Sequence, residues 1–257
     1  MQALVRTAVA RYVQSGLETD VSTALNRLFT NDLRPKADPV IFSPANAFRA
    51  HCYTEEVDDV LRLHEDALRL IYTAICNLKP MSMELGGMAN LLFTHSDWLD
   101  FLRIFKLVDL DVTDNDGTLC FCWGKMVTIN EQNPKDRIKL THASFEDFLE
   151  ALCRLAAMKG LPTDKEIANQ AAEDGEPDGN AGIFLLKLAD VPADYDTFLQ
   201  ERHTEWGKLP TAQPLARCVD HLCEVLIVFC QGGKERTNRD GLKLTQKQVN
   251  NTFKGKS

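Results

Sequence analysis

The acidic and hydroxyl side chains that begin at Asp111 are the first candidates for metal chemistry. A calcium-binding helix–loop–helix loop places oxygen ligands at positions 1, 3 and 5, glycine at position 6 and a bidentate glutamate at position 12. Counted from Asp111, Thr113 and Asn115 occupy positions 3 and 5. However, Gly117 falls one position late, and Cys122 stands at position 12. Because a thiol cannot supply the bidentate oxygen pair, we predict that this loop binds no calcium.

Two further stretches fail the same test. The second contains Asn133, Lys135 and Arg137 at ligand spacing, and two of these three side chains are cations that cannot ligate a metal. An acidic stretch over 174–179 matches the first half of a calcium loop, but Leu185 stands where the glutamate is required. The sequence therefore predicts no metal ion and no other cofactor.

The sequence contains no motif with the spacing of a catalytic site. Cys218, His221 and Cys223 lie close together, but no second pair of ligands follows at zinc-finger spacing. Residues 232–234 are loosely similar to a phosphate-binding loop, but Glu235 stands where serine or threonine would bind magnesium. The six histidines show no paired spacing, and no serine or cysteine lies in a nucleophile turn. We therefore expect a protein that binds other proteins and is not an enzyme.

Charge is distributed unevenly along the 257 residues, whose formal net charge is −8. From Lys234 onward seven basic residues stand against two acidic ones, a net charge of +5, so the preceding residues carry −13. An acidic body argues against general binding of nucleic acid. No apolar run reaches the roughly 20 residues that span a bilayer, and the N-terminus lacks the apolar block of a signal peptide. We therefore expect a cytoplasmic protein with no membrane contact.

The periodicity of apolar residues predicts a mainly helical fold, because these residues recur at spacings of three and four. Ser144 is expected to cap a helix, with Asp147 at its third position in the manner of a capping box. Residues 137–140 alternate like a short strand. The predicted helices cover 3–14, a segment that begins near Asp20, 56–78, one or two segments within 81–105, 115–126, 145–159 and 211–231. The side chains expected to be buried together in the body are Trp98, Phe101, Leu102, Phe148, Leu149 and Leu152.

The N-terminal region carries apolar residues on one face of its second helix, followed by Arg34-Pro35 and Asp38-Pro39. This pattern, over roughly residues 8–55, resembles the dimerisation and docking module of the regulatory-subunit type found in protein kinase A and in ciliary proteins. The resemblance implies a dimeric four-helix bundle, one face of which accepts a partner's amphipathic helix. Pro44 departs from the family pattern, because the family's second helix is already under way there. The residues implied to bind the partner are Val21, Leu25, Leu28, Phe29, Pro39 and Phe42.

A second interpretation of the same region remains open. Residues 1–55 would fold back as a helix–turn–helix onto the helices at 57–78 and 211–231, and would bury the same apolar side chains internally.

The body shows a second resemblance, in five segments that run from 68–72 and 98–102 through 121–123 to 138–140 and 145–156. These segments resemble the EF-hand-like repeats of axonemal and tubulin-associated proteins, in which a short strand leads into a helix of the FEDFLEAL type. The resemblance implies two helix–loop–helix units that share a small strand pairing and bury their helix faces together.

Together the two resemblances imply a component of the ciliary or flagellar axoneme, of the kind found in radial-spoke stalks. We expect a structural or scaffolding protein whose partners are other axonemal proteins, through amphipathic helices or tubulin, with a homodimer or heterodimer formed by the N-terminus. The alternative is a cytosolic calcium-responsive regulator of the EF-hand type. The expected domains are a docking-like segment (1–55), an EF-hand-like body (56–162), an acidic linker (163–182), C-terminal helices (183–232) and a basic tail (233–257).

Overall fold

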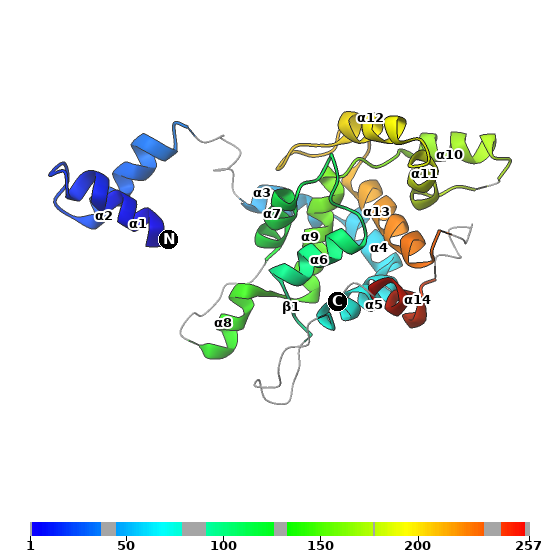
Figure 1. Ribbon diagram of the computed structural model, residues 1–257, viewed down its shortest axis with the longest axis horizontal. Coiled ribbons are helices and arrows are strands. Elements are labelled where there is room, and N and C mark those ends of the chain that lie inside the picture. Colours follow the sequence, from blue (N-terminus) through cyan, green and yellow to red (C-terminus); the bar gives the residue numbers. More distant parts are fainter. Residues whose placement is uncertain are drawn as a thin grey trace. The chain divides into compact units, whose positions relative to one another are not determined.

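The computed structural model describes residues 2–36, 45–78, 91–125, 133–176, 178–233 and 243–254 of the chain. The chain divides into two compact units, Met1–Ala45 and Asn46–Ser257. Both units are built from helices, and the described residues form a single two-stranded sheet (Figure 1). The predicted mainly helical fold is therefore confirmed. None of the helices in these ranges combines the length and the apolar character needed to cross a membrane.

The smaller unit contains two helices, each of which continues into a stretch of π-helix. They are α1 (Gln2–Ala8) with η1 (Val9–Val13), and α2 (Val21–Arg27) with η2 (Leu28–Leu33). We call residues 2–36 the N-terminal hairpin. The elements of the larger unit are α3 (Ala45–Cys52), α4 (Glu55–Leu63), α5 (Glu65–Cys76), β1 (Phe93–Thr94), α6 (His95–Ile104), α7 (Asp114–Gly124), α8 (Pro134–Thr141), β2 (His142–Ala143), α9 (Phe145–Met158), α10 (Asp164–Glu173), α11 (Ala181–Leu188), α12 (Pro192–Arg202), α13 (Leu215–Cys230) and α14 (Gln246–Phe253).

The two strands pair with each other, and each leads directly into a helix. β1 precedes α6, β2 precedes α9, and the antiparallel register places Phe93 opposite Ala143. The expected strand at 137–140 is wrong, because those residues belong to α8 and the strand begins only at His142. Proline suits the first position of a helix, and Pro134 occupies that position in α8. The strand pairing brings the starts of α6 and α9 together.

Capping boxes fix where the main helices of the body begin. The hydroxyl of Ser144 accepts a hydrogen bond from the backbone N–H of Asp147, and the Asp147 carboxylate accepts one from the Ser144 N–H. Thr94 and Asp97 form the same reciprocal pair at the start of α6. Each pair satisfies backbone donors that a helix terminus leaves without a partner. The predicted cap of α9 is confirmed.

The long helix expected at 56–78 is broken into α4 and α5 at His64. The His64 side chain is buried, and its Nε2 lies 2.6 Å from Oδ1 of Asp220 on α13. The helical repeat is interrupted at this residue, and α5 restarts with Glu65 and Asp66 in its first turn. Acidic residues at that position stabilise a helix N-terminus. The residue at the break thus contacts a partner 156 residues away in the sequence.

Phe148 lies at the centre of an aromatic cluster in the core of the larger unit. Its ring centroid is 5.7 Å from that of Tyr72, 5.8 Å from Phe101, 6.1 Å from Phe93 and 6.2 Å from Trp98. The six side chains expected to share this core do so, with Leu149 alone left half-buried at its margin. Around the cluster α9 packs on α7, α5 and α13, so this ring lies where several helices of the larger unit meet.

The regions expected to be a linker and a tail both contain helices. α10 occupies the first half of 163–182, and a capping box of Thr163 and Glu166 sets its start. Within 233–257, α14 packs on α5 and α13 and buries Val249 and Phe253. The closing helix predicted at 211–231 is α13, which begins at Leu215.

Replacing Phe148 with alanine is expected to lower the free energy of unfolding by about 3–5 kcal/mol, because a fully buried ring leaves a cavity that its neighbours cannot fill. Denaturant unfolding followed by circular dichroism measures this loss. Leu63→Ala is the matched control, since Leu63 is 73% exposed and its loss should cost no more than about 0.5 kcal/mol. Equal losses in the two variants would contradict the central position of Phe148.

Candidate partner-binding site

The N-terminal hairpin forms from local sequence signals. Asp20 caps α2 by accepting a hydrogen bond from the backbone N–H of Thr23 at 2.9 Å. The turn before it contains Gly16, whose φ of +75° lies in the left-handed region that glycine adopts without strain. α1 and α2 pack against each other within this unit.

The hairpin has a small core of its own. Among residues 3–36 the buried side chains are Ala8, Tyr12, Ala24 and Leu28, and the half-buried apolar side chains packed around them are Leu4, Val13, Leu25 and Leu33. Two of the four buried side chains are alanines, which contribute little apolar area. The apolar surface removed from water inside this unit is therefore small.

Polar contacts tie the two helices together at Tyr12. The Tyr12 hydroxyl donates to Asp32 at 2.5 Å, and Arg11 pairs with the same carboxylate at 2.9 Å. The Arg27 guanidinium lies over the Tyr12 ring at 5.2 Å and pairs with Glu18 at 2.6 Å. The hydrogen bond to Asp32 raises the pKa of Tyr12 above its ordinary value. These contacts lie at or near the surface and contribute modestly to stability.

The structure separates the predicted partner-binding residues into three groups. Leu28 is 3% exposed and belongs to the core of the hairpin, whereas Leu25 is half-buried beside that core. Val21 and Phe29 are exposed, at 44% and 37%. Pro39 and Phe42 lie outside the described residues. Val21 and Phe29 are thus the predicted side chains that a partner can reach directly.

The first helix adds a row that was not among the predicted site residues. Val5 and Val9 are half-buried and stand four residues apart, the same spacing that relates Val21 to Leu25 and Leu25 to Phe29. Residues four apart lie on one side of a helix. Each helix of the hairpin therefore carries a row of apolar side chains that its own core covers only in part. The four-residue spacing of Val5 and Val9 is the sequence signal that could have identified the row on the first helix.

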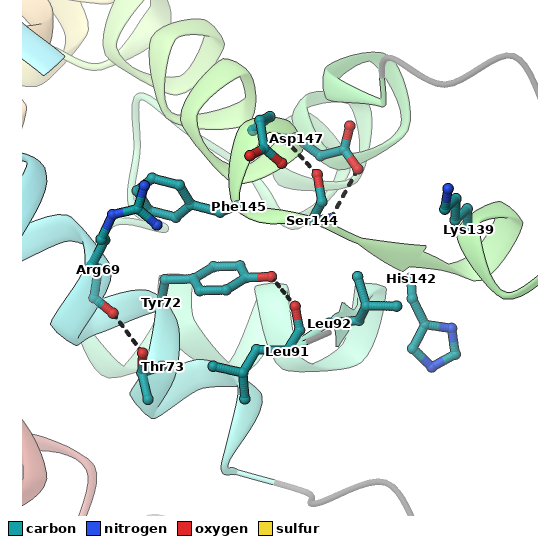
Figure 2. Close-up of a pocket in the computed structure, with 11 residues that line it drawn as sticks. Arg69, Tyr72, Thr73, Leu91, Leu92, Lys139, His142, Ser144, Phe145 and Asp147 are labelled. Atoms are coloured by element: carbon teal, nitrogen blue, oxygen red, sulfur yellow. Dashed lines mark hydrogen bonds between the residues drawn. The ribbon is translucent and has the colours of Figure 1, made fainter. Parts of the chain in front are cut away.

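A pocket of about 540 Å³ lies beside the strand pair in the larger unit, between α5 and the start of α9 (Figure 2). Tyr72 donates its hydroxyl hydrogen bond to the Leu91 carbonyl there, and the Arg69 guanidinium lies 4.2 Å from the centroid of the Phe145 ring. Arg69 and Lys139 line the pocket together with acidic side chains, so neither sign of charge prevails. The arrangement indicates no particular class of ligand.

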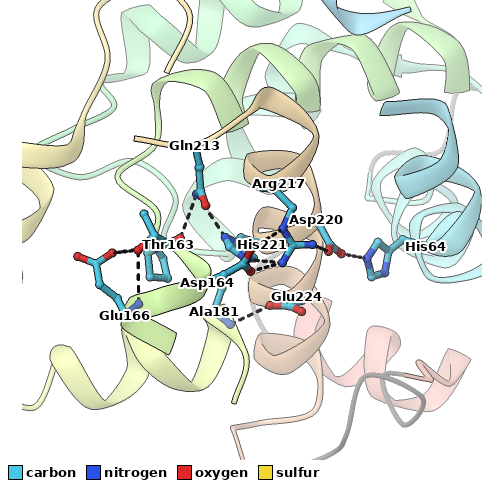
Figure 3. Close-up of polar contacts among 11 residues, drawn as sticks. His64, Thr163, Asp164, Glu166, Ala181, Gln213, Arg217, Asp220, His221 and Glu224 are labelled. Carbon is cyan, nitrogen blue, oxygen red and sulfur yellow. Dashed lines mark hydrogen bonds and ion pairs between the residues drawn. The ribbon is translucent and has the colours of Figure 1, made fainter. Parts of the chain in front are cut away.

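A polar network runs along α13 from buried His64 and Asp220 to the exposed Asp164 (Figure 3). Asp220 contacts His64 through one carboxylate oxygen and Arg217 through the other. Arg217 also pairs with Asp164 at the start of α10, and Nε2 of His221 lies 3.2 Å from that carboxylate. Both aspartates are thus satisfied by arginine and histidine side chains. The network links α4, α10 and α13.

The network also shifts the pKa values of its members. Burial lowers the pKa of His221 below its ordinary value of 6.5, and the nearby charge of Arg217 lowers it further. Burial by itself would raise the pKa of Asp220, but the hydrogen bond from His64 and the charges of His64 and Arg217 hold it below its ordinary value.

The candidate calcium loop has its oxygens engaged by the protein. Asp111 is buried, its Oδ1 lies 2.7 Å from Nζ of Lys159, and its Oδ2 accepts a hydrogen bond from the Gly160 N–H at 2.8 Å. Thr113 and Asp116 form the capping box of α7. Within the described ranges, no three His, Cys, Asp or Glu side chains are grouped to hold a metal ion.

No protein-family model matches the chain, and neither a curated protein nor a solved structure was found to match it. The two family resemblances inferred from the residues therefore stay predictions.

Replacing Asp111 with alanine is expected to lower the free energy of unfolding by about 3–5 kcal/mol, because Lys159 would be left buried without its partner. The loss should be the same with and without calcium in thermal and denaturant unfolding. The control is Asp114→Ala, which removes an exposed ion pair with Arg103 and should cost about 0–1 kcal/mol. The opposite result would show that Asp111 is a metal ligand. In that case Asp111→Ala would be as stable as the wild type without calcium, and added calcium would stabilise the wild type but not the variant.

The lowered pKa of His221 predicts that stability falls as the pH drops below 6.5. The unfolded chain protonates this histidine at about pH 6.5, whereas the folded chain resists protonation until a lower pH. Melting temperatures between pH 7.5 and 5 should therefore decline, and His221→Gln should make the decline shallower. The exposed His203 supplies the matched control, because His203→Gln should leave the slope unchanged. Identical slopes for the wild type and His221→Gln would contradict the assignment.

Proposed function

We propose that this chain is a non-catalytic scaffolding component of the ciliary or flagellar axoneme and that it joins a partner protein through its N-terminal hairpin. The observation that carries the proposal is the small core of this hairpin, in which four side chains are buried while Val21 and Phe29 stay exposed.

A physical argument supports a partner at this position. Small compact units bury a smaller fraction of their apolar surface than large ones, and the smallest usually need a disulfide, a metal or an oligomeric partner. The compact unit here is Met1–Ala45, its described residues include no cysteine, and partly covered apolar rows run along both helices of the hairpin. Covering those rows with a second copy or with a partner's amphipathic helix would complete a helical bundle.

The larger unit supports a scaffolding role. Its core is continuous from α3 to α14, and its buried charges are paired internally, as in Asp111 with Lys159 and Glu150 with Arg154. Such a body can present a surface of fixed shape to its neighbours. The axonemal assignment is drawn from the resemblance of the N-terminal region to docking modules and of the body to EF-hand-like repeats.

The double change Val21→Glu and Phe29→Glu tests the proposal in ciliated cells. The tagged wild-type chain should remain with detergent-extracted axonemes, whereas the variant should be released, because two carboxylates would be buried against the partner without compensation. The free energy of unfolding of the larger unit should not change.

A matched control carries the same charge on the same helix. Ser22→Glu with Thr30→Glu alters neighbouring exposed polar positions, and this variant should stay with the axoneme. If the wild type is soluble throughout the cytoplasm, the axonemal proposal is wrong. Retention of the Val21→Glu and Phe29→Glu variant would instead place the binding surface elsewhere on the chain.

A further inference from the structure

The C-terminal helix α14 packs on the larger unit through two apolar side chains on one side of the helix. Figure 1 shows it in dark red beside α5, and it packs on both α5 and α13. Val249 is fully buried and Phe253 is 8% exposed, so the two anchors stand four residues apart on one side of the helix. Its other described residues are exposed or half-buried.

α14 lies in a groove between α5 and α13. The side chains and helices that form this groove are held in place by contacts with other parts of the core. The Phe253 ring lies 5.8 Å from the Phe105 ring, and Phe105 in turn lies 4.9 Å from Phe101 and 5.2 Å from Phe229. α5 also packs on α6 and α9, while α13 packs on α4, α9 and α11. The side chains that line this groove therefore belong to the main core, and Val249 and Phe253 of α14 complete that core at its edge.

The attachment of α14 is mainly apolar. Beside the two anchors, the half-buried Leu244 packs against the core, the Thr252 side chain hydrogen-bonds with Cys230, and a hydrogen bond of 3.3 Å runs from the Gln231 side chain to the carbonyl of Lys243. The helix contains its own start signal, a capping box of Thr245 and Gln248. Helices of this length do not persist in water without packing, so α14 depends on the groove for its structure.

Charge complements the apolar fit. Residues 243–254 contain Lys243, Lys247 and Lys254 and no acidic residue, and all three lysines are exposed. The residues before Lys234 carry a net charge of −13. An acidic body attracts basic helices over a distance of several ångströms and thereby speeds their association.

We propose that the groove between α5 and α13 is a docking site for a basic amphipathic helix of a partner protein, and that α14 occupies this site until the partner displaces it. The partner helix would carry two apolar anchors four residues apart, the larger one aromatic, with lysine or arginine on its outer face. This site lies on the larger unit and is independent of the N-terminal hairpin.

A labelled synthetic peptide of residues 243–254 serves as the probe, with binding to the full chain measured by fluorescence anisotropy. Val249→Ser with Phe253→Ser in the full chain removes both anchors and should free the groove. The peptide should bind this variant at least about tenfold more tightly than the wild type, because cis occupancy reduces the fraction of chains that can accept it. A peptide that carries the same two serines should not bind.

Asn250→Ser with Asn251→Ser is the matched control, since both residues are exposed on the same helix, and it should bind the peptide as the wild type does. The hairpin variant Val21→Glu and Phe29→Glu should also behave as the wild type, which separates this proposal from the proposed function. Equal binding to all chains, or no binding to any, would overturn the proposal. The proposal would also be overturned if the wild type sedimented as a dimer and the Val249→Ser and Phe253→Ser variant as a monomer. The occupant of the groove would then be the helix of a second copy.

If the two serines prevent folding, hydrogen exchange on the wild-type chain decides. Excess unlabelled peptide should accelerate exchange of the amides in Gln246–Phe253 and leave those in α9 unchanged. Unchanged exchange in α14 would show that the helix is a permanent part of the core.

Discussion

The antiparallel pairing of β1 with β2 and the packing of Phe148 beneath it are the constraint on which the larger unit depends. Each strand has only two residues, so the pairing cannot be stable without the helices that follow it. Phe148 comes from the helix after β2, and it contacts rings from α5, β1 and α6. One side chain therefore connects α5, β1, α6 and α9. The positions of α7, α13 and α14 follow, since each packs on helices that this cluster orients.

Charge plays a different part inside the body than on its surface. Glu150 on α9 accepts hydrogen bonds from Arg154 at 2.6 Å and from Arg49 of α3 at 3.0 Å, and Arg49 also donates to the carbonyls of Trp123 and Lys125. Removing one member of such a buried pair leaves an uncompensated charge, which makes the arrangement specific even where its net stabilisation is small.

Local signals in the sequence predicted the parts of the fold that local contacts determine. Ser144 and Asp147 predicted the start of α9, because a capping box is encoded within four residues. The break at His64 was not predicted from the apolar periodicity, and the buried contact of His64 is with Asp220 on a distant helix. α14 was missed because its polar residues outnumber its apolar ones, and Val249 and Phe253 are recognisable as anchors only once the groove is formed. In the candidate site, apolar spacing identified the correct helix but could not show that Leu28 faces inward while Phe29 remains exposed.

The central claim is that the N-terminal hairpin cannot be stable by itself and is completed by a partner. Hydrogen exchange of the amides in Val21–Arg27, measured alongside sedimentation, tests it most directly. The account predicts that these amides exchange nearly as fast as an unfolded segment in a monomeric chain and become protected only when the chain associates with a second copy or another protein. Protection in the monomer equal to that of α9 would contradict the account.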